Sequence, residues 1–192
     1  MMDINSPKYN YAQLVNLSPP KRYSKKVFVK SLKQKQFHIH NRENFNKPQG
    51  GLWSSTYHSS GLFNSDWIQW CAENCQPDWI GHDNILLEIK KTARIFTIHS
   101  FQDLKNLYSL YPVDIYGSTY QRDYTICYLD FENIRKDYDI IWMTDEGQHM
   151  TRYTEHFGDN KRLDLYGWDC ESSLILNNVV NRFKKVTTRK RS

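Results

Sequence analysis

Short apolar or alternating runs recur along the chain from about residue 34, separated by polar stretches rich in turn-forming residues. Runs of this kind predict β-strands, here at 36–40, 51–55, 84–89, 94–99, 138–143, 163–168 and 172–176. The stretch 44–51, Asn-Phe-Asn-Lys-Pro-Gln-Gly-Gly, predicts a loop. In the first strand, Phe37 and Ile39 are expected on one face, and His38 and His40 on the other.

Helical spacing that follows a capping residue predicts the helices. Ser65 is expected to begin a helix that ends near residue 74, Ser100 a helix that ends near 108, and Thr144 a helix that ends near 158. A helical turn at 131–135 and a last short helix capped at Asn177–Asn178 complete the pattern. Because strands and helices alternate without a regular βαβ rhythm, we expect an α+β fold with mixed or antiparallel sheets rather than a doubly wound sheet.

A length of 192 residues with 39% hydrophobic residues suits one domain with loose ends. Residues 1–33 are expected to form a flexible basic N-terminal arm, because Ser18-Pro19-Pro20 breaks any helix and its flanks are polar. Residues 34–183 are the predicted domain, and 184–192 are expected to form a basic tail.

Basic residues gather toward the two ends, and the net charge is +5. The run Lys21–Lys35 holds seven Lys or Arg and no acid, and Arg182–Arg191 holds six and no acid. Such runs can bind nucleic acid or an acidic partner, or can serve only as solvated ends. No run of about 18 apolar residues predicts a membrane helix, and residues 1–17 lack the apolar stretch of a secretory signal. We therefore expect a cytoplasmic protein with no membrane partner; the oligomeric state stays open.

The four cysteines are Cys71, Cys75, Cys127 and Cys170. The spacing of the first two predicts one face of a helix, but no further ligands follow at the spacing of a zinc site. We therefore expect reduced, partly buried thiols and no metal. The glycine-rich signatures of Rossmann and P-loop nucleotide sites are absent from the sequence.

Three segments carry the candidate chemistry: the His-bearing strand 37–41, the pair 47–55 and 65–71, and the late segment 168–177. Together they resemble the ADP-ribosyltransferase superfamily, chiefly its divergent poly(ADP-ribose) polymerase-like branch. Gly51-Leu52-Trp53-Ser54-Ser55 is similar to that branch's second strand, with Trp53 where the family has Tyr. The stretch that begins at Glu171 and ends at Asn177 is similar to its late strand. Asn41 stands where the family has Gly after the first-strand His.

This resemblance implies a fold of two small mixed or antiparallel sheets flanked by helices. It also implies an NAD-dependent mono-ADP-ribosyltransferase, a glycosyltransferase in chemical class, that modifies a protein or nucleic-acid acceptor, as effectors and toxins do. Cleavage of the nicotinamide–ribose bond passes through an oxocarbenium-like transition state, which a carboxylate on a rigid strand stabilises. Glu171 is the expected catalytic carboxylate, and an ordinary exposed strand residue is the alternative.

The resemblance also assigns residues that bind NAD as a co-substrate. His40, with His38 as the alternative and Asn41 beside it, is expected to hold the adenosine-side ribose. Trp53, with Trp67 or Trp70, would stack on the nicotinamide; Gly51 would let the backbone approach the ligand; Ser54, Ser55 and Ser65 would bond its carboxamide. Each of these side chains has an ordinary structural role as its alternative. We expect Glu171 to lie within reach of Trp53 and His40 across a cleft between two sheets.

A second function stays open from the sequence alone. The chain could be a catalytically inactive scaffold of the same fold that binds protein or nucleic acid through its basic ends and their interleaved tyrosines. In the enzyme, the basic ends are expected to bind the acceptor or a partner rather than take part in NAD chemistry.

Overall fold

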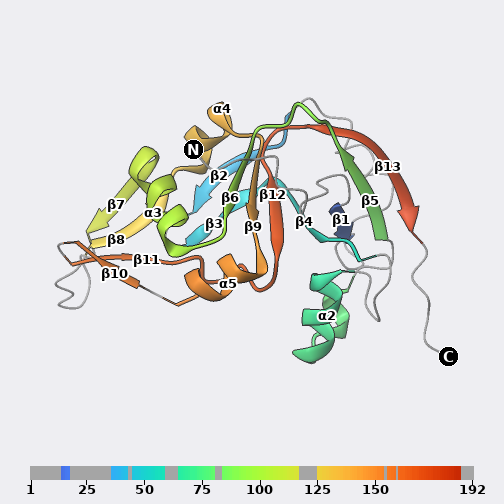
Figure 1. Cartoon of the computed structure of the whole chain (residues 1–192), viewed down its shortest axis with the longest axis horizontal. Helices are drawn as coiled ribbons and strands as arrows, with labels where there is room; N and C mark the ends of the chain where they lie inside the picture. Colours follow the sequence, from blue (N-terminus) through green and yellow to red (C-terminus); the bar gives the residue numbers. More distant parts are fainter. Residues whose placement is uncertain are drawn as a thin grey trace.

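The fold is α+β, as the sequence predicts, with mixed sheets and short helices (Figure 1). The computed structural model describes residues 14–17, 36–42, 45–58, 65–80, 84–116, 125–153, 155–158 and 160–186. In that part of the chain, no helix combines the length and apolar character needed to cross a bilayer.

A seven-stranded sheet runs through the molecule in the order β13-β5-β1-β4-β12-β9-β6. Its strands are β13 (Val180–Val186), β5 (Asn84–Ile89), β1 (Leu14–Leu17), β4 (Leu52–Thr56), β12 (Ser172–Ile175), β9 (Ile140–Met143) and β6 (Ile95–Ile98). Neighbours are antiparallel except β6 and β9, which are parallel. The main sheet is therefore larger than the two small sheets that the resemblance implies.

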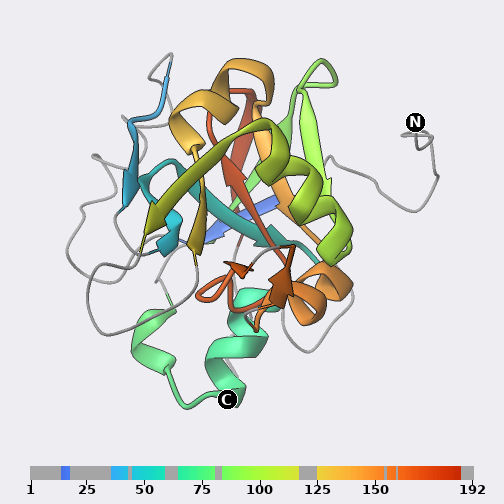
Figure 2. The same ribbon diagram turned by 90° about the vertical axis from the view of Figure 1, so that its left-hand side faces the viewer.

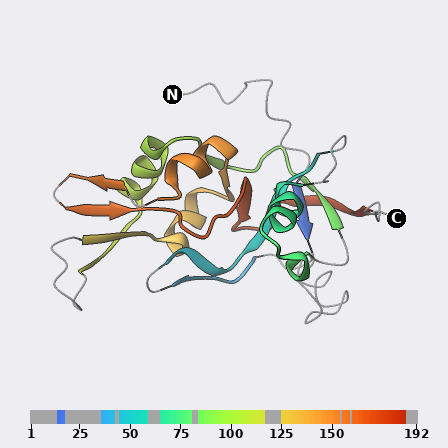
Figure 3. The same cartoon turned by 90° about the horizontal axis from the view of Figure 1, so that it is seen from below.

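Two further sheets lie on the side of the molecule away from β5 and β13 (Figures 1 and 3). The four-stranded sheet has the order β10 (Glu155–Phe157), β11 (Lys161–Leu163), β8 (Thr125–Leu129), β7 (Pro112–Tyr116). The two-stranded ribbon joins β2 (Ile39–Arg42) to β3 (Phe45–Gly50). The helices are α2 (Asp66–Glu73), η1 (Pro77–Trp79), α3 (Phe101–Leu110), α4 (Phe131–Asp137) and α5 (Asp145–Thr151).

The alternation of side chains along β12 divides the core between the two faces of the large sheet. Leu174 pairs with Trp53 and with Ile141, and it faces the larger cluster, which contains residues of α3, α4 and β8. Ile175, one residue on, pairs with Leu52 of β4 and faces the smaller cluster around Leu87. Both clusters are buried from water, which is the main stabilising contribution in a domain of this size.

The three predicted helix starts are confirmed by their caps. Ser65 Oγ accepts the Ile68 N–H at 3.3 Å, and Ser100 Oγ accepts the Asp103 N–H at 3.2 Å. Thr144 Oγ1 accepts the Gly147 N–H at 3.0 Å. Each bond satisfies an N–H that the first turn leaves without an intrahelical partner.

Several predicted boundaries are wrong for local reasons. The helix after Thr144 ends at Thr151, not near 158. The Thr151 hydroxyl donates to Gly147 O at 2.7 Å, and the Thr151 carbonyl accepts the Leu165 N–H at 2.8 Å instead of an N–H from a further helical turn. The strand predicted at 163–168 is wrong: only Leu163 belongs to a strand, β11 (Lys161–Leu163), and 164–168 contain a turn. After Asn177, the predicted helix is the strand β13: Asn178 Oδ1 accepts the Val180 N–H at 3.2 Å in a local turn, and the chain then pairs with β5.

Elsewhere the structure adds strands where loops or an arm are predicted. The predicted loop 44–51 contains β3, whose Pro48 is tolerated because the ribbon leaves one edge of β3 unpaired within its own sheet. Leu14–Leu17, predicted in the flexible arm, is the strand β1 and pairs with both β4 and β5. The rest of 1–33, apart from these four residues, lies outside the described residues, as does 187–192, while 184–186 belong to β13.

Candidate functional site

Glu171 immediately precedes β12, opposite Thr56 at the end of β4. The Thr56 hydroxyl donates to one carboxylate oxygen, and the Asp145 backbone N–H donates to the other at 3.0 Å. Burial raises the pKa of Glu171 above its ordinary value, the neighbouring charges of Asp66 and Asp145 raise it further, and the two hydrogen bonds oppose this. The carboxylate is thus fixed and partly withdrawn from water between the first turns of α2 and α5.

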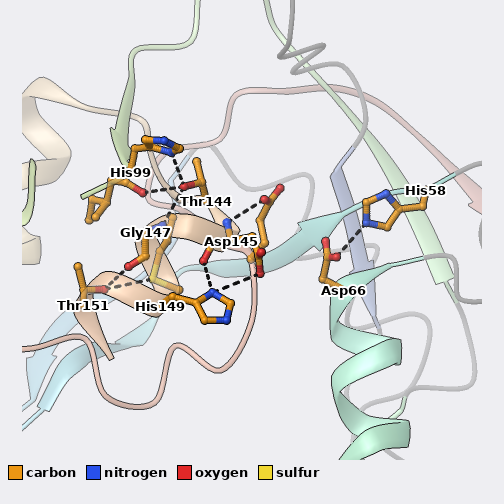
Figure 4. Close-up of polar contacts among 11 residues, drawn as sticks. His58, Asp66, His99, Thr144, Asp145, Gly147, His149 and Thr151 are labelled. Atoms are coloured by element: carbon orange, nitrogen blue, oxygen red, sulfur yellow. Dashed lines mark hydrogen bonds and ion pairs between the residues drawn. The ribbon is translucent and has the colours of Figure 1, made fainter. Parts of the chain in front are cut away.

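Asp66 brings a second carboxylate to this region from the first turn of α2. His58 Nε2 lies 2.9 Å from Asp66 Oδ1 (Figure 4). The other oxygen, Asp66 Oδ2, is buried and has no hydrogen-bond partner in the described part of the chain. A buried carboxylate oxygen without a partner is costly in a structural role and is suited to accepting a bond from a ligand.

The beginning of α5, whose polar contacts are drawn in Figure 4, presents the Asp145 N–H to Glu171. His99 Nδ1 lies 2.9 Å from Thr144 Oγ1, and His149 Nδ1 lies 2.8 Å from the Asp145 carbonyl. These contacts fix the turn that presents the Asp145 N–H to Glu171. The sequence shows Thr144 as a helix cap but carries no local signal that brings Thr56 or Asp145 to Glu171, because both contacts depend on strand pairing.

Among the predicted NAD-binding residues, Ser65 and Ser54 lie on the Glu171 side of the sheet. Ser65 forms a bridge with Tyr57, directly after Thr56, and Ser54 shares the face of Thr56. Ser54 Oγ lies 3.4 Å from Ser173 O, while Ser55 Oγ and Ser173 Oγ are buried without partners among the described residues.

Trp67 belongs to a stack of three indoles on α2 and η1. Its ring centroid lies 5.3 Å from that of Trp70 and 6.2 Å from that of Trp79, with interplanar angles of 10° and 16°. The centroids of Trp70 and Trp79 lie 6.0 Å apart, so each of the three rings already has two aromatic neighbours.

Trp53 lies on the opposite face of the sheet from Glu171, because adjacent positions of β4 alternate. Its ring packs edge-to-face on Trp168 with centroids 4.7 Å apart, and Lys47 Nζ lies 4.9 Å from its centroid. Lys47 also donates to Gly167 O at 2.6 Å, and burial lowers the pKa of this lysine. The structure therefore gives Trp53 a packing role and does not place it beside Glu171.

The His-bearing segment lies at the other end of the strands. Gly51 N–H donates to His38 O at 2.8 Å, which places this segment at the beginning of β4, whereas Glu171 lies at its end. Glu171 lies opposite Thr56, and the five strand steps from Gly51 to Thr56 span about 17 Å. The predicted reach from Glu171 to His40 is therefore wrong. In Figures 1 and 2, α4, which contacts β2, and α2 likewise lie at opposite ends of β4 and β12.

Local contacts explain what these residues do instead. His38 and His40 share an exposed face, as predicted, with ring centroids 4.2 Å apart, and His40 Nδ1 lies 3.4 Å from Glu132 Oε1. Asn41 Nδ2 donates to Asp130 at 2.8 Å and its Oδ1 accepts the Phe131 N–H at 2.8 Å, so this residue ties β2 to α4. Gly51 has a φ of +69°, as a tight turn requires.

The cysteines are free thiols, of which Cys71 and Cys127 are buried. Burial raises the pKa of Cys71 to about 11 and also raises the pKa of Cys170, which makes both thiols poor nucleophiles. Cys75 does not share a helix face with Cys71, since α2 ends at Glu73 and Cys75 has a φ of +54°. Within the described ranges, no group of three or more His, Cys, Asp or Glu side chains is arranged to hold a metal ion.

Comparisons with known proteins leave the chain without a family assignment. No protein-family model, no curated protein and no solved structure gives a significant match to it.

Proposed function

We propose that the protein cleaves the nicotinamide–ribose bond of NAD with Glu171 as its catalytic carboxylate and transfers the ADP-ribosyl group to a macromolecular acceptor. The observation that carries this proposal is the setting of Glu171: a partly buried carboxylate directly before the central strand β12, fixed by the Thr56 hydroxyl and the Asp145 N–H. A fixed, poorly hydrated anion stabilises a developing cation more strongly than a mobile one in water does.

The charge of the surroundings supports the nicotinamide end of NAD rather than its phosphates. The nicotinamide ring is cationic before cleavage, and the ribose carries the positive charge afterwards. Glu171, Asp66 and Asp145 provide carboxylates for both stages. The same set repels a pyrophosphate, so the phosphates would lie away from it. Asp66 Oδ2, buried without a partner among the described residues, is the group most suited to accept a hydrogen bond from a ribose hydroxyl.

In this proposal the residues around Glu171 have different roles. Glu171 stabilises the oxocarbenium-like transition state, and the bond from Asp145 holds it in place. Ser65 and Ser54 lie on the same side of the sheet but are buried, with Ser65 capping α2 and Ser54 bonded to Ser173 O, so they support the site rather than contact NAD. His38, His40, Asn41 and Trp53 have no part in the reaction, since they lie at the other end or on the other face of the strand.

One observation favours the non-catalytic scaffold as the second candidate. Both carboxylate oxygens of Glu171 are already bonded to protein groups, which is also how an acidic side chain ties a strand to the start of a helix.

Release of nicotinamide from NAD by the purified protein, with and without a cell lysate as acceptor source, decides between the two. We expect Glu171→Gln to lower release by about 100-fold or more while the protein stays folded, because the change is nearly isosteric and removes the charge. Glu146→Gln, the same change at an exposed position of α5, is the matched control and should retain activity. Equal turnover by wild type and Glu171→Gln, or no release by the wild type with any acceptor, would leave the scaffold as the function.

A further inference from the structure

A pocket of about 310 Å³ opens where β3, β8, β11 and the C-terminal end of α5 meet. Its lining includes three aromatic side chains from separate segments, Phe45, Tyr153 and Tyr166, which are 45%, 73% and 61% exposed. Large aromatic groups that gather at a surface without being covered mark a binding site more often than a packing defect.

The polar lining of the pocket is mainly cationic. Arg152 and Arg162 line it together with one acid, Asp164, whose carboxylate accepts the Tyr166 N–H at 3.0 Å. Phe45, one of the lining aromatics, also has the Arg42 guanidinium 5.2 Å from its ring centroid. The two guanidinium groups and the one carboxylate of the lining favour an anionic ligand, and the aromatic walls favour one that contains a flat ring.

The floor of the pocket is held rigidly by Asn46. Its Nδ2 donates to Cys127 O at 3.1 Å and to Asp164 O at 2.8 Å, and its Oδ1 accepts the Leu129 N–H at 2.7 Å. Trp168 Nε1 donates to the Asn46 carbonyl at 2.7 Å. Because the amide of Asn46 joins β3, β8 and the segment after β11, the pocket is formed before any ligand arrives.

We propose that this pocket binds an unpaired base of a single-stranded nucleic acid. The base stacks on Tyr153 or Tyr166, Arg152 and Arg162 contact the flanking phosphates, and Asp164 accepts an exocyclic amino or ring N–H of the base. The volume lies at the lower end of the range of about 300–1,000 Å³ for ligand pockets, which suits one base. A duplex keeps its bases stacked and cannot offer one. An acidic peptide would use the arginines but not the aromatic walls.

Two segments connect this pocket to Glu171. Helix α5 presents the Asp145 N–H to Glu171 at its first residue and is followed directly by Arg152, which lines the pocket; seven helical residues span about 10 Å. The segment that carries Asp164 and Tyr166 continues to Glu171 itself. When one base of a nucleic-acid strand occupies the pocket, the adjacent nucleotides therefore lie near the Glu171 carboxylate. The claim that the bound nucleic acid is the ADP-ribose acceptor rests on the proposed function. The claim that the pocket binds single-stranded nucleic acid does not.

The test measures fluorescence anisotropy of labelled 12-nucleotide single strands of DNA and of RNA, and of the matching duplexes, with the full chain. We expect the wild type to prefer single strands to duplex. Tyr153→Ala with Tyr166→Ala should weaken strand binding about tenfold or more, and Trp79→Ala, which removes an exposed aromatic ring elsewhere, should stay within about twofold. Arg152→Gln should reduce the steepness of log K against log salt by about 0.7. Lys91→Gln removes one charge from an exposed turn between β5 and β6, and it should leave the slope unchanged.

The single variants Tyr166→Ala and Arg152→Gln keep the test decisive where the double variant fails to fold. Wild-type binding that the pocket variants do not weaken, a preference for duplex, or a pocket-dependent preference for a polyglutamate peptide over the strands would overturn the proposal. Glu171→Gln should bind strands like the wild type. Pocket-dependent strand binding by a wild type that releases no nicotinamide would leave this proposal standing and remove the proposed enzyme.

Discussion

At the scale of single residues, the structure separates side chains that the sequence could only group by analogy. Glu171 has a defined setting, with a hydroxyl and a backbone N–H on its two oxygens. His40 and Asn41 instead contact α4 through Glu132 and Asp130. A strand reverses the face of its side chains at every step, so a motif of five residues contains both site-facing and core-facing positions. This is why Ser54 and Trp53, adjacent in one motif, lie on opposite sides of the sheet.

The raised pKa of Glu171 predicts how the free energy of unfolding changes with pH. Between the ordinary pKa of a glutamate and the higher pKa of Glu171, the folded protein holds a proton that the unfolded chain has lost, so stability falls as pH rises through this window. Glu171→Gln removes this penalty. We expect the variant to have a higher free energy of unfolding than the wild type at pH 7, and the difference to shrink toward zero near pH 4, in urea titrations monitored by circular dichroism.

The same titrations on Glu146→Gln, the matched change at an exposed position of α5, are the reference for the effect of the substitution itself. A Glu171→Gln protein that is less stable than the wild type at both pH values would mean that the two bonds to Glu171 outweigh its desolvation, as a structural strand–helix tie requires.

At the scale of elements, α5 connects the candidate site to the core. Gly147 in its second half-turn lies directly against β6: a Cβ on this residue would be 2.1 Å from Ile98 O and 2.9 Å from the Ile98 carbonyl carbon. Both contacts are with backbone, which cannot rotate away. The glycine therefore sets how closely α5 approaches the sheet, and with it the position of the Asp145 N–H.

We expect Gly147→Ala to destabilise the protein by about 1–3 kcal/mol through overpacking, despite a gain of up to about 1 kcal/mol in helix propensity. It should also lower nicotinamide release, because displacement of α5 moves the bond that fixes Glu171. Thermal melting and the nicotinamide assay measure the two effects. Glu146→Ala, at the exposed neighbour, is the control for an alanine substitution in the same turn without the close approach to β6. A Gly147→Ala protein as stable and as active as Glu146→Ala would show that α5 adjusts freely.

How far the sequence predicts these elements depends on whether their signals are local. The caps at Ser65, Ser100 and Thr144 are satisfied within one turn, and all three helix starts are predicted correctly. Strands β7 and β8 were not predicted, and β13 was predicted as a helix, because their stability comes from partners distant in sequence. The candidate site is predictable only as far as Glu171 itself; Thr56, Asp145 and the Asn46 pocket floor depend on register, which no local pattern contains.

At the scale of the whole molecule, β1 connects two parts of the large sheet. Leu14–Leu17 pairs with β4 on one side and with β5 on the other. In the described strand order, β5 and β13 join the rest of the sheet only through it. The N-terminal region is therefore part of the fold at this point, and the stability of the Glu171 side should depend on a segment more than 150 residues away in sequence, since β4 carries Thr56.

Substitution of Val15 by proline tests this connection. Val15 pairs with Ser55 and with Leu86, so it lies in a strand bonded on both sides. Proline removes the N–H that one of these ladders needs and fixes φ, and the carbonyl left without its donor should cost about 1–3 kcal/mol. The matched control is Asn181→Pro: Asn181 lies at the bulge between Val180 and Arg182 in the edge strand β13, where proline is tolerated. Urea unfolding of the two variants should therefore show a much lower midpoint for Val15→Pro, with Asn181→Pro close to the wild type. Equal midpoints for all three proteins would mean that β1 contributes nothing to the cooperative unit, and that β5 and β13 unfold independently of the strands that hold Glu171.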